Sequence, residues 1–331
     1  MNKLRSVGIL GIGSYMPEKV VTNADIVKTV DTTEEWIITR TGIQERRVAD
    51  ESIATSDLST EAALRACKDA NISPEEIDLI IVATLTPDMA FPSTACIVQK
   101  NIGAVNAAAF DLEAACSGFL YGITIGKQFI ATGEYEKVLV IGGETMSKIV
   151  DWKDRNTCVL FGDGAGAVVL GPTEEGHGIL STYLGADGEG GKFLYVPAGG
   201  SRQPISVRAI EESEHFIKMD GSEVFKFAVR VMGKAALQAI EKAGLTADDI
   251  DYIVPHQANI RIIEAAAKKL KMPMDKVHVN LHKYGNTSAA SVPVALDEAI
   301  KENKIKKGDH VVLVGFGGGL TWGATVIKWN K

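Results

Sequence analysis

An internal repeat is the feature of this sequence that most limits its fold. Residues 63–81 (ALRACKDANISPEEIDLII) align with residues 236–254 (ALQAIEKAGLTADDIDYIV), and seven of the 19 aligned residues are identical. The same offset of 173 residues places 138–142 (VLVIG) on 311–315 (VVLVG). A chance likeness between two helices would not keep one register so far along the chain. We therefore expect two halves that fold alike, 1–172 and 173–331.

Apolar runs of strand length alternate with helical patterns in both halves, which is typical of a layered α/β fold with buried strands. The hydrophobic fraction of 46% is large enough to build such a core. The predicted strands are 7–12, 79–83, 107–112, 138–141, 167–170, 253–254, 311–314 and 324–328. The predicted helices are 56–71, 117–132, 221–243, 261–270 and 291–302. In the glycine-rich segment 185–215 we expect turns and short strands.

Charge and cysteine content exclude several classes of protein. The net charge of −7 argues against non-specific binding to nucleic acid, which needs a basic surface. No apolar run reaches the length of about 18 residues that a membrane span requires. The four cysteines, Cys67, Cys96, Cys116 and Cys158, form no C-x-x-C pair and are too few for a disulfide scaffold. We expect a reduced, cytoplasmic chain with neither nucleic-acid nor membrane partners.

Cys116 is the cysteine best placed for chemistry. It lies between a predicted strand and a predicted helix, and reactive groups of α/β sheets gather where strands end and helices begin. Backbone N–H groups at a helix N-terminus favour a thiolate, so we expect a lowered pKa for Cys116. The alternative is a buried structural cysteine, and that description fits Cys67, Cys96 and Cys158.

His256 and Asn286 occupy related positions in the second half. His256 follows a predicted strand, and the repeat offset pairs it with Ala83 at the end of a first-half strand. Asn286 lies three residues before Ala289, which is the counterpart of Cys116. Taken alone, Asn286 is better explained as a helix N-cap or a turn residue. If the halves pack about a pseudo-twofold axis, however, the three side chains converge, and a thiol gains base or donor partners.

Two glycine runs and a basic patch are further candidates for binding sites. Residues 162–167 (GDGAGA) precede a strand instead of opening a helix, so they do not form a dinucleotide-binding motif. Residues 317–319 (GGG) follow a strand, and their N–H groups can approach a ligand closely or simply form a tight turn. Arg261, Lys268 and Lys269 share one face of a predicted helix. That face can receive an acidic partner or merely be solvated.

Four motifs together resemble those of β-ketoacyl-acyl-carrier-protein synthase III, the family that starts bacterial fatty-acid synthesis. They are AACSG at 114–118, HQAN at 256–259, GNTSAA at 285–290 and GFGGGLTWG at 315–323. Their order and spacing match over nearly the whole chain, and the likeness is greatest to enzymes of Gram-positive, Bacillus-like bacteria. The resemblance implies an α/β, thiolase-like fold of five layers (αβαβα), built from two similar halves, and a homodimer.

The resemblance also implies a reaction in two stages, without a metal or a cofactor. Cys116 would take a short acyl group from acyl-CoA as a thioester. Malonyl-acyl carrier protein would then lose CO₂, and its carbanion would attack that thioester. His256 and Asn286 would hydrogen-bond the enolate-like oxygen, while the N–H groups of Cys116 and Gly318 would hold the thioester oxyanion. The sequence leaves open whether the starter is acetyl or a short branched acyl group.

Substrate contacts follow from the same resemblance. The residues that it assigns to CoA are Thr32, Trp36, Arg40, Arg155 and Asn259. Phe91 and Phe225 are assigned to the acyl pocket, with Phe91 closing the pocket of the partner subunit. Arg261, Lys268 and Lys269 would receive the acidic carrier protein.

Five other interpretations of the sequence compete with this one. A thiolase needs a second catalytic cysteine in the C-terminal half, and none follows Cys158. An elongating synthase would have histidine in place of Asn286, and a plant-type polyketide synthase is usually longer. A silent interaction scaffold would not need the set of Cys116, His256 and Asn286. A starter enzyme of specialised metabolism, of polyketide or quinolone type, stays as the alternative.

Overall fold

Two β-sheets organise the chain, and the computed structural model describes residues 4–331. The first sheet has the strand order β1-β7-β6-β4-β5, and the second has the order β8-β13-β12-β11. The first sheet comprises β1 (Val7–Tyr15), β4 (Leu79–Ala83), β5 (Ala108–Leu112), β6 (Val138–Thr145) and β7 (Asp163–Pro172). The second comprises β8 (Gly178–Ala186), β11 (Tyr252–Pro255), β12 (His310–Gly317) and β13 (Thr321–Lys328). The strand Val7–Tyr15 confirms the predicted first strand and extends it.

The two sheets repeat the same pairing pattern. Strands β4 and β6 run parallel, as do β11 and β12. In the first sheet β7 pairs antiparallel with β6 and β1, and in the second β13 pairs antiparallel with β12 and β8. Where β5 pairs with β4 in the first sheet, only an isolated parallel bridge joins Val277 to Ile253 in the second. The short helix η2 (Ala115–Ser117) and helix α5 (Gly118–Thr132) recur 173 residues later as η7 (Ser288–Ala290) and α11 (Ser291–Lys301). The division at 172/173 itself stays a prediction.

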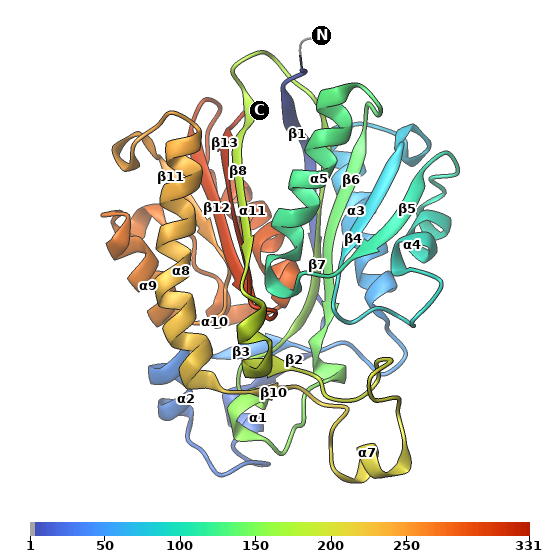
Figure 1. The fold of residues 1–331 in the computed structure, drawn as a ribbon, viewed down its shortest axis with the longest axis vertical. Coiled ribbons are helices and arrows are strands. Elements are labelled where there is room, and N and C mark those ends of the chain that lie inside the picture. Colours follow the sequence, from blue (N-terminus) through green and yellow to red (C-terminus); the bar gives the residue numbers. More distant parts are fainter. Residues whose placement is uncertain (1–3) are drawn as a thin grey trace.

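Five layers result from this repeat (Figure 1). Helices α3 (Thr55–Ala70) and α4 (Thr94–Ile102) cover the outer face of the first sheet. Helices α8 (Gly221–Lys242) and α9 (Ile260–Lys269) lie outside the second sheet, with α8 packed on its strands and α9 packed on α8. Helices α5 and α11 lie between the sheets and contact both of them. The fold is therefore the αβαβα arrangement of a thiolase-like protein, as predicted.

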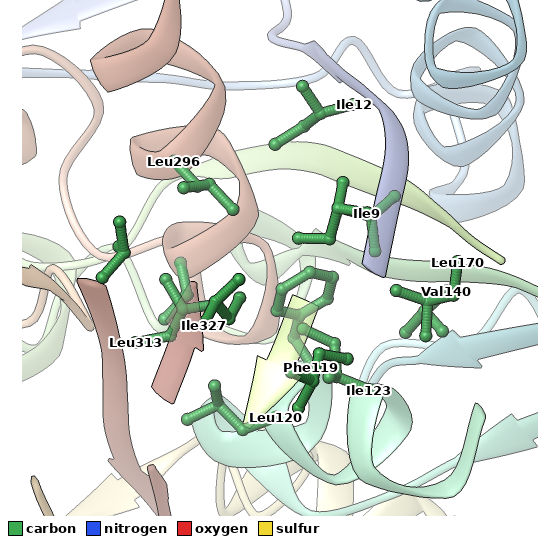
Figure 2. Packing of buried hydrophobic residues seen from close by; sticks show 14 of the residues in the cluster. Ile9, Ile12, Phe119, Leu120, Ile123, Val140, Leu170, Leu296, Leu313 and Ile327 are labelled. Carbon is green, nitrogen blue, oxygen red and sulfur yellow. The ribbon is translucent and has the colours of Figure 1, made fainter. Parts of the chain in front are cut away.

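Strand side chains alternate between the middle layer and the outer layers. On β6, Val138 and Val140 join the central core, whereas Leu139 and Ile141 pack under α3. Figure 2 shows the central core, where Phe119, Leu120 and Ile123 of α5 meet Leu296 of α11 and side chains from both sheets. Burying each such aliphatic or aromatic side chain stabilises the fold by about 1.5–3 kcal/mol. Both faces of both sheets are covered, and this explains why the strand sequences are continuous apolar runs.

Shorter elements gather at the end of the molecule where β6 and β12 finish (Figure 1). The helices there are α1 (Asn23–Ile26), α2 (Glu34–Thr41), α6 (Arg155–Cys158), α7 (Val207–Glu211) and α10 (Leu281–Tyr284). The strands are β2 (Val20–Thr22), β3 (Glu45–Arg47), β9 (Leu194–Tyr195) and β10 (Lys218–Met219). Segment 185–215 contains only short elements, as its lack of periodicity indicates. These pieces form a cap over the strand ends on which the candidate site lies.

Candidate active site

Cys116 lies on the 3₁₀ turn η2, directly before α5, and its side chain is buried. The preceding residue, Ala115, has a φ of +45°, in the left-handed region that costs a non-glycine residue about 1–2 kcal/mol. The backbone of β12 approaches this turn so closely that a Cβ on Gly317 would lie 2.6 Å from the Cys116 nitrogen. The glycine run at 317–319 therefore brings peptide groups against the nucleophile, and only glycine fits at position 317.

His256 follows β11 and is buried and neutral. Its backbone N–H donates to the Val314 carbonyl at 2.7 Å, which fixes the residue at the end of the strand. Its Nδ1 lies 2.6 Å from the Ser291 hydroxyl, which itself accepts a hydrogen bond from the Gln257 N–H at 3.4 Å. We therefore assign the Ser291 hydroxyl as the donor to Nδ1, which places the proton of the neutral ring on Nε2. Burial lowers the pKa of His256 to about 3.

Asn286 is held by its own backbone and by its side-chain oxygen. Its N–H donates to the Leu160 carbonyl at 2.8 Å, and its carbonyl accepts from the Gly162 N–H at 3.0 Å. Its Oδ1 accepts from the Ser288 N–H at 2.9 Å. The remaining polar group of the side chain is therefore the Nδ2 donor. Asn286 and His256 each present an N–H donor and no positive charge.

Two pockets meet at Cys116. The first is lined by Cys116, His256 and Asn286, together with Phe225, Asn259, Phe316 and apolar neighbours. The second is lined by Leu85, Glu113, Met146, Ile217, Gly318 and Gly319, besides Cys116. The structure therefore brings the three predicted residues of chemistry to one pocket, from η2, β11 and the turn before η7. Phe225 lines the pocket that contains His256, and Gly318 lines the other pocket.

The predicted lowering of the Cys116 pKa is wrong. Burial raises the pKa of the thiol to about 12, although a hydrogen bond with the Ser288 side chain acts in the opposite direction. The sequence correctly indicates a helix N-terminus beside Cys116, but it does not show how deeply the side chain is buried. At neutral pH the residue is a thiol, so its reaction as a nucleophile requires loss of a proton.

Glu144 is a second buried acid at the site, and the sequence analysis missed it. It lies near the end of β6, fully buried. Its carboxylate accepts from the Thr84 hydroxyl at 3.1 Å, from the Leu85 and Thr86 N–H groups, and from the Ser288 hydroxyl at 2.9 Å. Burial nevertheless raises its pKa to about 7. The available signal was a lone acid at the end of a strand otherwise built of apolar residues and glycines.

The residues assigned to CoA lie on the cap, apart from the three residues around Cys116. The Arg155 guanidinium lies over the Trp36 ring at 5.1 Å from its centre, and Arg155 also donates to the Asp31 carbonyl. The Thr32 hydroxyl is buried and has no hydrogen-bond partner within residues 4–331. Asn259 reaches from the Cys116 pocket toward this group, because its Nδ2 donates to the Arg40 carbonyl at 2.9 Å.

The remaining predicted residues lie on the surface. Phe91 is 84% exposed and lines neither of the two pockets at Cys116. Arg261, at the start of α9, lies over the Phe225 ring at 5.3 Å. Lys268 and Lys269 are exposed at the other end of that helix, and the Lys269 stem packs against Gly233 of α8. Cys67 and Cys158 are buried, but Cys96 is exposed, which corrects the expectation that all three are buried.

The described residues contain neither a cluster of metal-ligating side chains nor a helix suited to a membrane. Between residues 4 and 331, no three His, Cys, Asp or Glu side chains are grouped so that they could hold a metal ion. Within the same range, no helix is both long enough and apolar enough to cross a membrane.

Comparisons with known proteins agree on one family. The family model for 3-oxoacyl-[acyl-carrier-protein] synthase III matches residues 110–188, and the model for the C-terminal part of that synthase matches residues 240–329. Beta-ketoacyl-[acyl-carrier-protein] synthase III of Caldanaerobacter subterraneus is 65% identical over 98% of both chains, and synthase III 1 of Bacillus anthracis is 55% identical over 98% of this chain and 100% of its own. The crystal structure of 3-oxoacyl-[acyl-carrier-protein] synthase III from Aquifex aeolicus is 50% identical, with a TM-score of 0.90 over 98% of this chain and 100% of that one.

The raised pKa of Glu144 predicts a pH-dependent cost to stability. Between the ordinary glutamate pKa of 4.5 and the folded value of about 7, the folded chain keeps a proton that the unfolded chain has released. The free energy of unfolding therefore falls as pH rises through this window. The Glu144→Gln variant has no such ionisation, so its free energy of unfolding should not fall in this window. The difference in unfolding free energy, variant minus wild type, should therefore increase by on the order of 2 kcal/mol from pH about 5 to pH about 8. Urea unfolding of both proteins at the two pH values measures this difference, and the same difference at both pH values would refute the prediction.

Proposed function

The chain belongs to the β-ketoacyl-[acyl-carrier-protein] synthase III family, and on that premise we propose how its residues share the work of the reaction. As an acyltransferase of this family, it catalyses the initiating condensation of fatty-acid synthesis. An acyl-CoA and malonyl-acyl carrier protein give 3-oxoacyl-acyl carrier protein, CoA and CO₂. The proposal rests on one observation: a buried thiol shares one pocket with the neutral side chains of His256 and Asn286.

In the first stage, Cys116 attacks the thioester carbonyl of acyl-CoA and retains the acyl group. Negative charge develops on the carbonyl oxygen, and the backbone N–H groups of Cys116 and Gly318 receive it. Support comes from Thr321, whose hydroxyl lies 2.9 Å from the Ala114 carbonyl oxygen and 3.0 Å from that of Gly318, so that its one proton is shared between them. This contact links the glycine run to the nucleophile turn and favours N–H groups that are already positioned when the charge appears.

In the second stage, His256 and Asn286 act on malonyl-acyl carrier protein. Loss of CO₂ converts the malonyl thioester into an enolate, and its oxygen then carries negative charge. Nε2–H of His256 and Nδ2–H of Asn286 donate hydrogen bonds to this oxygen. These hydrogen bonds become stronger as the negative charge grows. A neutral donor suits this role, because the hydrogen bond from Ser291 to Nδ1 keeps the proton on Nε2. The carbanion then attacks the Cys116 thioester.

CoA enters as a substrate, and the reaction needs no cofactor or metal. The adenine lies beside Trp36 and Arg155, and the unpartnered Thr32 hydroxyl supplies a hydrogen bond to the base or phosphate, with Arg40 nearby. The pantetheine arm passes Asn259, whose side chain links α2 to the pocket. This path leads from the cap to the Cys116 sulfur.

A second copy of the chain completes the acyl pocket. The acyl group on Cys116 lies in the pocket lined by Leu85 and Met146, with Phe225 on the other side of the sulfur. The exposed apolar side chains Met89, Phe91 and Val105 flank α4, beside the edge strand β5. Burying this surface in a homodimer brings Phe91 of one subunit to the acyl pocket of its partner.

The acidic carrier protein docks on the basic face of α9. No carboxylate of the described chain forms an ion pair with Arg261, Lys268 or Lys269. Arg261 lies next to Phe225 at the mouth of the Cys116 pocket, so a carrier bound there delivers its malonyl group to the site.

Removing the two donors should separate the stages. In His256→Ala and Asn286→Ala, decarboxylation of malonyl-acyl carrier protein should fall by about 100-fold or more, the usual cost of losing an oxyanion donor. Acylation of Cys116 by acyl-CoA should stay within about threefold of wild type. Quenched-flow assays of CO₂ release and of acyl-enzyme measure the two steps. Equal loss of both steps would contradict this division of roles.

Charge reversal on α9 should affect one substrate only. Arg261→Glu and Lys268→Glu should each raise the KM for malonyl-acyl carrier protein by about tenfold, because a rim ion pair becomes a repulsion worth about 1 kcal/mol or more. The KM for acyl-CoA should hardly change. Lys304→Glu, which alters an exposed lysine on another surface, serves as the matched control. If Lys304→Glu raised the carrier-protein KM as much as Lys268→Glu, the docking surface would be wrongly placed.

A further inference from the structure

Cys116 needs a proton acceptor, and neither of its two pocket partners provides one. The thiol is protonated at neutral pH, because burial raises its pKa. Burial lowers the pKa of His256 to about 3, so its neutral ring is a weak proton acceptor, and the tautomer assigned above carries its proton on Nε2. The amide of Asn286 is not basic. The acceptor must therefore lie elsewhere around the sulfur.

Ser288 connects Cys116 to a buried carboxylate. Its hydroxyl is 2.9 Å from Oε1 of Glu144, and its side chain also hydrogen-bonds the Cys116 thiol. The backbone at Ser288 has a φ of +48°, a strained value for a residue with a side chain. Ser288 is the repeat counterpart of Ala115, whose φ is +45°. The strained turn η7 thus places a hydroxyl, where η2 has a methyl group, between the nucleophile and an acid.

We propose that Glu144 accepts the Cys116 proton through the Ser288 hydroxyl during acylation and returns it after condensation. This inference rests on the proposed function. Ser288 acts as the bridge, because its oxygen takes the thiol proton while its own proton passes to Oε1 of Glu144. The arrangement follows the general pattern of a nucleophile, a bridging or basic group and a fixed acid in mutual hydrogen-bond contact.

Atoms and protons balance over the two stages. In acylation, the Cys116 sulfur forms a bond to the acyl carbon, the bond from that carbon to the CoA sulfur breaks, and the thiol proton ends on Glu144. The CoA thiolate leaves and takes a proton from water. In condensation, malonyl loses CO₂, the new carbon–carbon bond forms, and the bond from Cys116 to the acyl carbon breaks. The released Cys116 thiolate then recovers its proton from Glu144 through Ser288.

The surroundings of Glu144 suit an acid that changes protonation state during turnover. Donors from Thr84, Leu85 and Thr86 stabilise the carboxylate, whereas burial favours the carboxylic acid. The two effects bring its pKa to about 7, so the carboxylate is populated at neutral pH. Between residues 4 and 331, no Lys, Arg or His side chain forms an ion pair with it.

Other titratable groups face this region from neighbouring elements. Cys116 lies on η2, and Glu113, just before η2, adds negative charge near the thiol. Neutral His256 follows β11. On β7, Asp163 is paired in register with Thr145 and is held by Ser147 and the Ala49 N–H. Apart from Cys116 itself, none of these groups bonds to the Ser288 side chain as Glu144 does, among the hydrogen bonds of the described residues.

The pH dependence of acylation tests the proposal. Single-turnover formation of the Cys116 acyl-enzyme is measured with acetyl-CoA and with isobutyryl-CoA, without malonyl substrate, from pH about 5.5 to about 9. In wild type the rate should rise with a midpoint near pH 7 as Glu144 ionises. In Glu144→Gln and in Ser288→Ala that rise should disappear, with a loss of about 100-fold at pH 8. Decarboxylation of malonyl-acyl carrier protein should stay within about threefold of wild type in both variants.

Glu113→Gln is the matched control, because it removes a carboxylate close to Cys116 that has no contact with Ser288 among the hydrogen bonds of the site. It should retain the rise near pH 7. Wild-type profiles in both Glu144→Gln and Ser288→Ala would overturn the proposal, as would loss of the rise in Glu113→Gln. If Glu144→Gln fails to fold, Ser288→Ala decides alone, because it leaves the other bonds of Glu144 intact. A wild-type protein that forms no acyl-enzyme at all would instead refute the proposed function.

Discussion

The placement of two helices between two sheets is the constraint on which the rest of this structure depends. Helices α5 and α11 are buried against both sheets, so their positions fix each sheet relative to the other. Glycines spaced four residues apart let α5 approach the first sheet: a Cβ on Gly118, Gly122 or Gly126 would lie within 3.1 Å of side chains on β4, β6 or β7. Because the turns before both helices reach the same end of the molecule, Cys116 and Asn286 meet there, beside the end of β11. The site is thus a consequence of how the core packs.

Depth of burial governs the electrostatics of this site. A thiol, an imidazole and a carboxyl group lie together with almost no access to water, and burial favours the uncharged form of each. Catalysis therefore begins from neutral groups, and charge appears only as bonds change. Hydrogen-bond donors that are already fixed in place, on His256, Asn286 and the glycine run, are most effective in such an environment because water does not compete with them.

Much of the architecture could be predicted from the repeat. An offset of 173 residues places η7 and α11 correctly from η2 and α5, and it locates Cys116, His256 and Asn286 at the ends of related elements. The predictions that failed were those that depend on how deeply a side chain is buried. Helix position alone suggested a lowered pKa for Cys116, and apolar neighbours suggested a buried Cys96, which is exposed on α4. Glu144 and Ser288 escaped notice because their contact joins residues 144 positions apart, and no local pattern reports such a pair. The place of Phe91 depends on a second subunit.

The central claim is that Cys116, alone among the four cysteines, carries the acyl group. Incubation with acyl-CoA in the absence of malonyl-acyl carrier protein, followed by peptide mass spectrometry, measures this directly. We expect one added acyl mass per chain, on the peptide that contains Cys116, even though Cys96 is the more exposed thiol. An acyl group on Cys67, Cys96 or Cys158, or no acyl group on any cysteine, would contradict it.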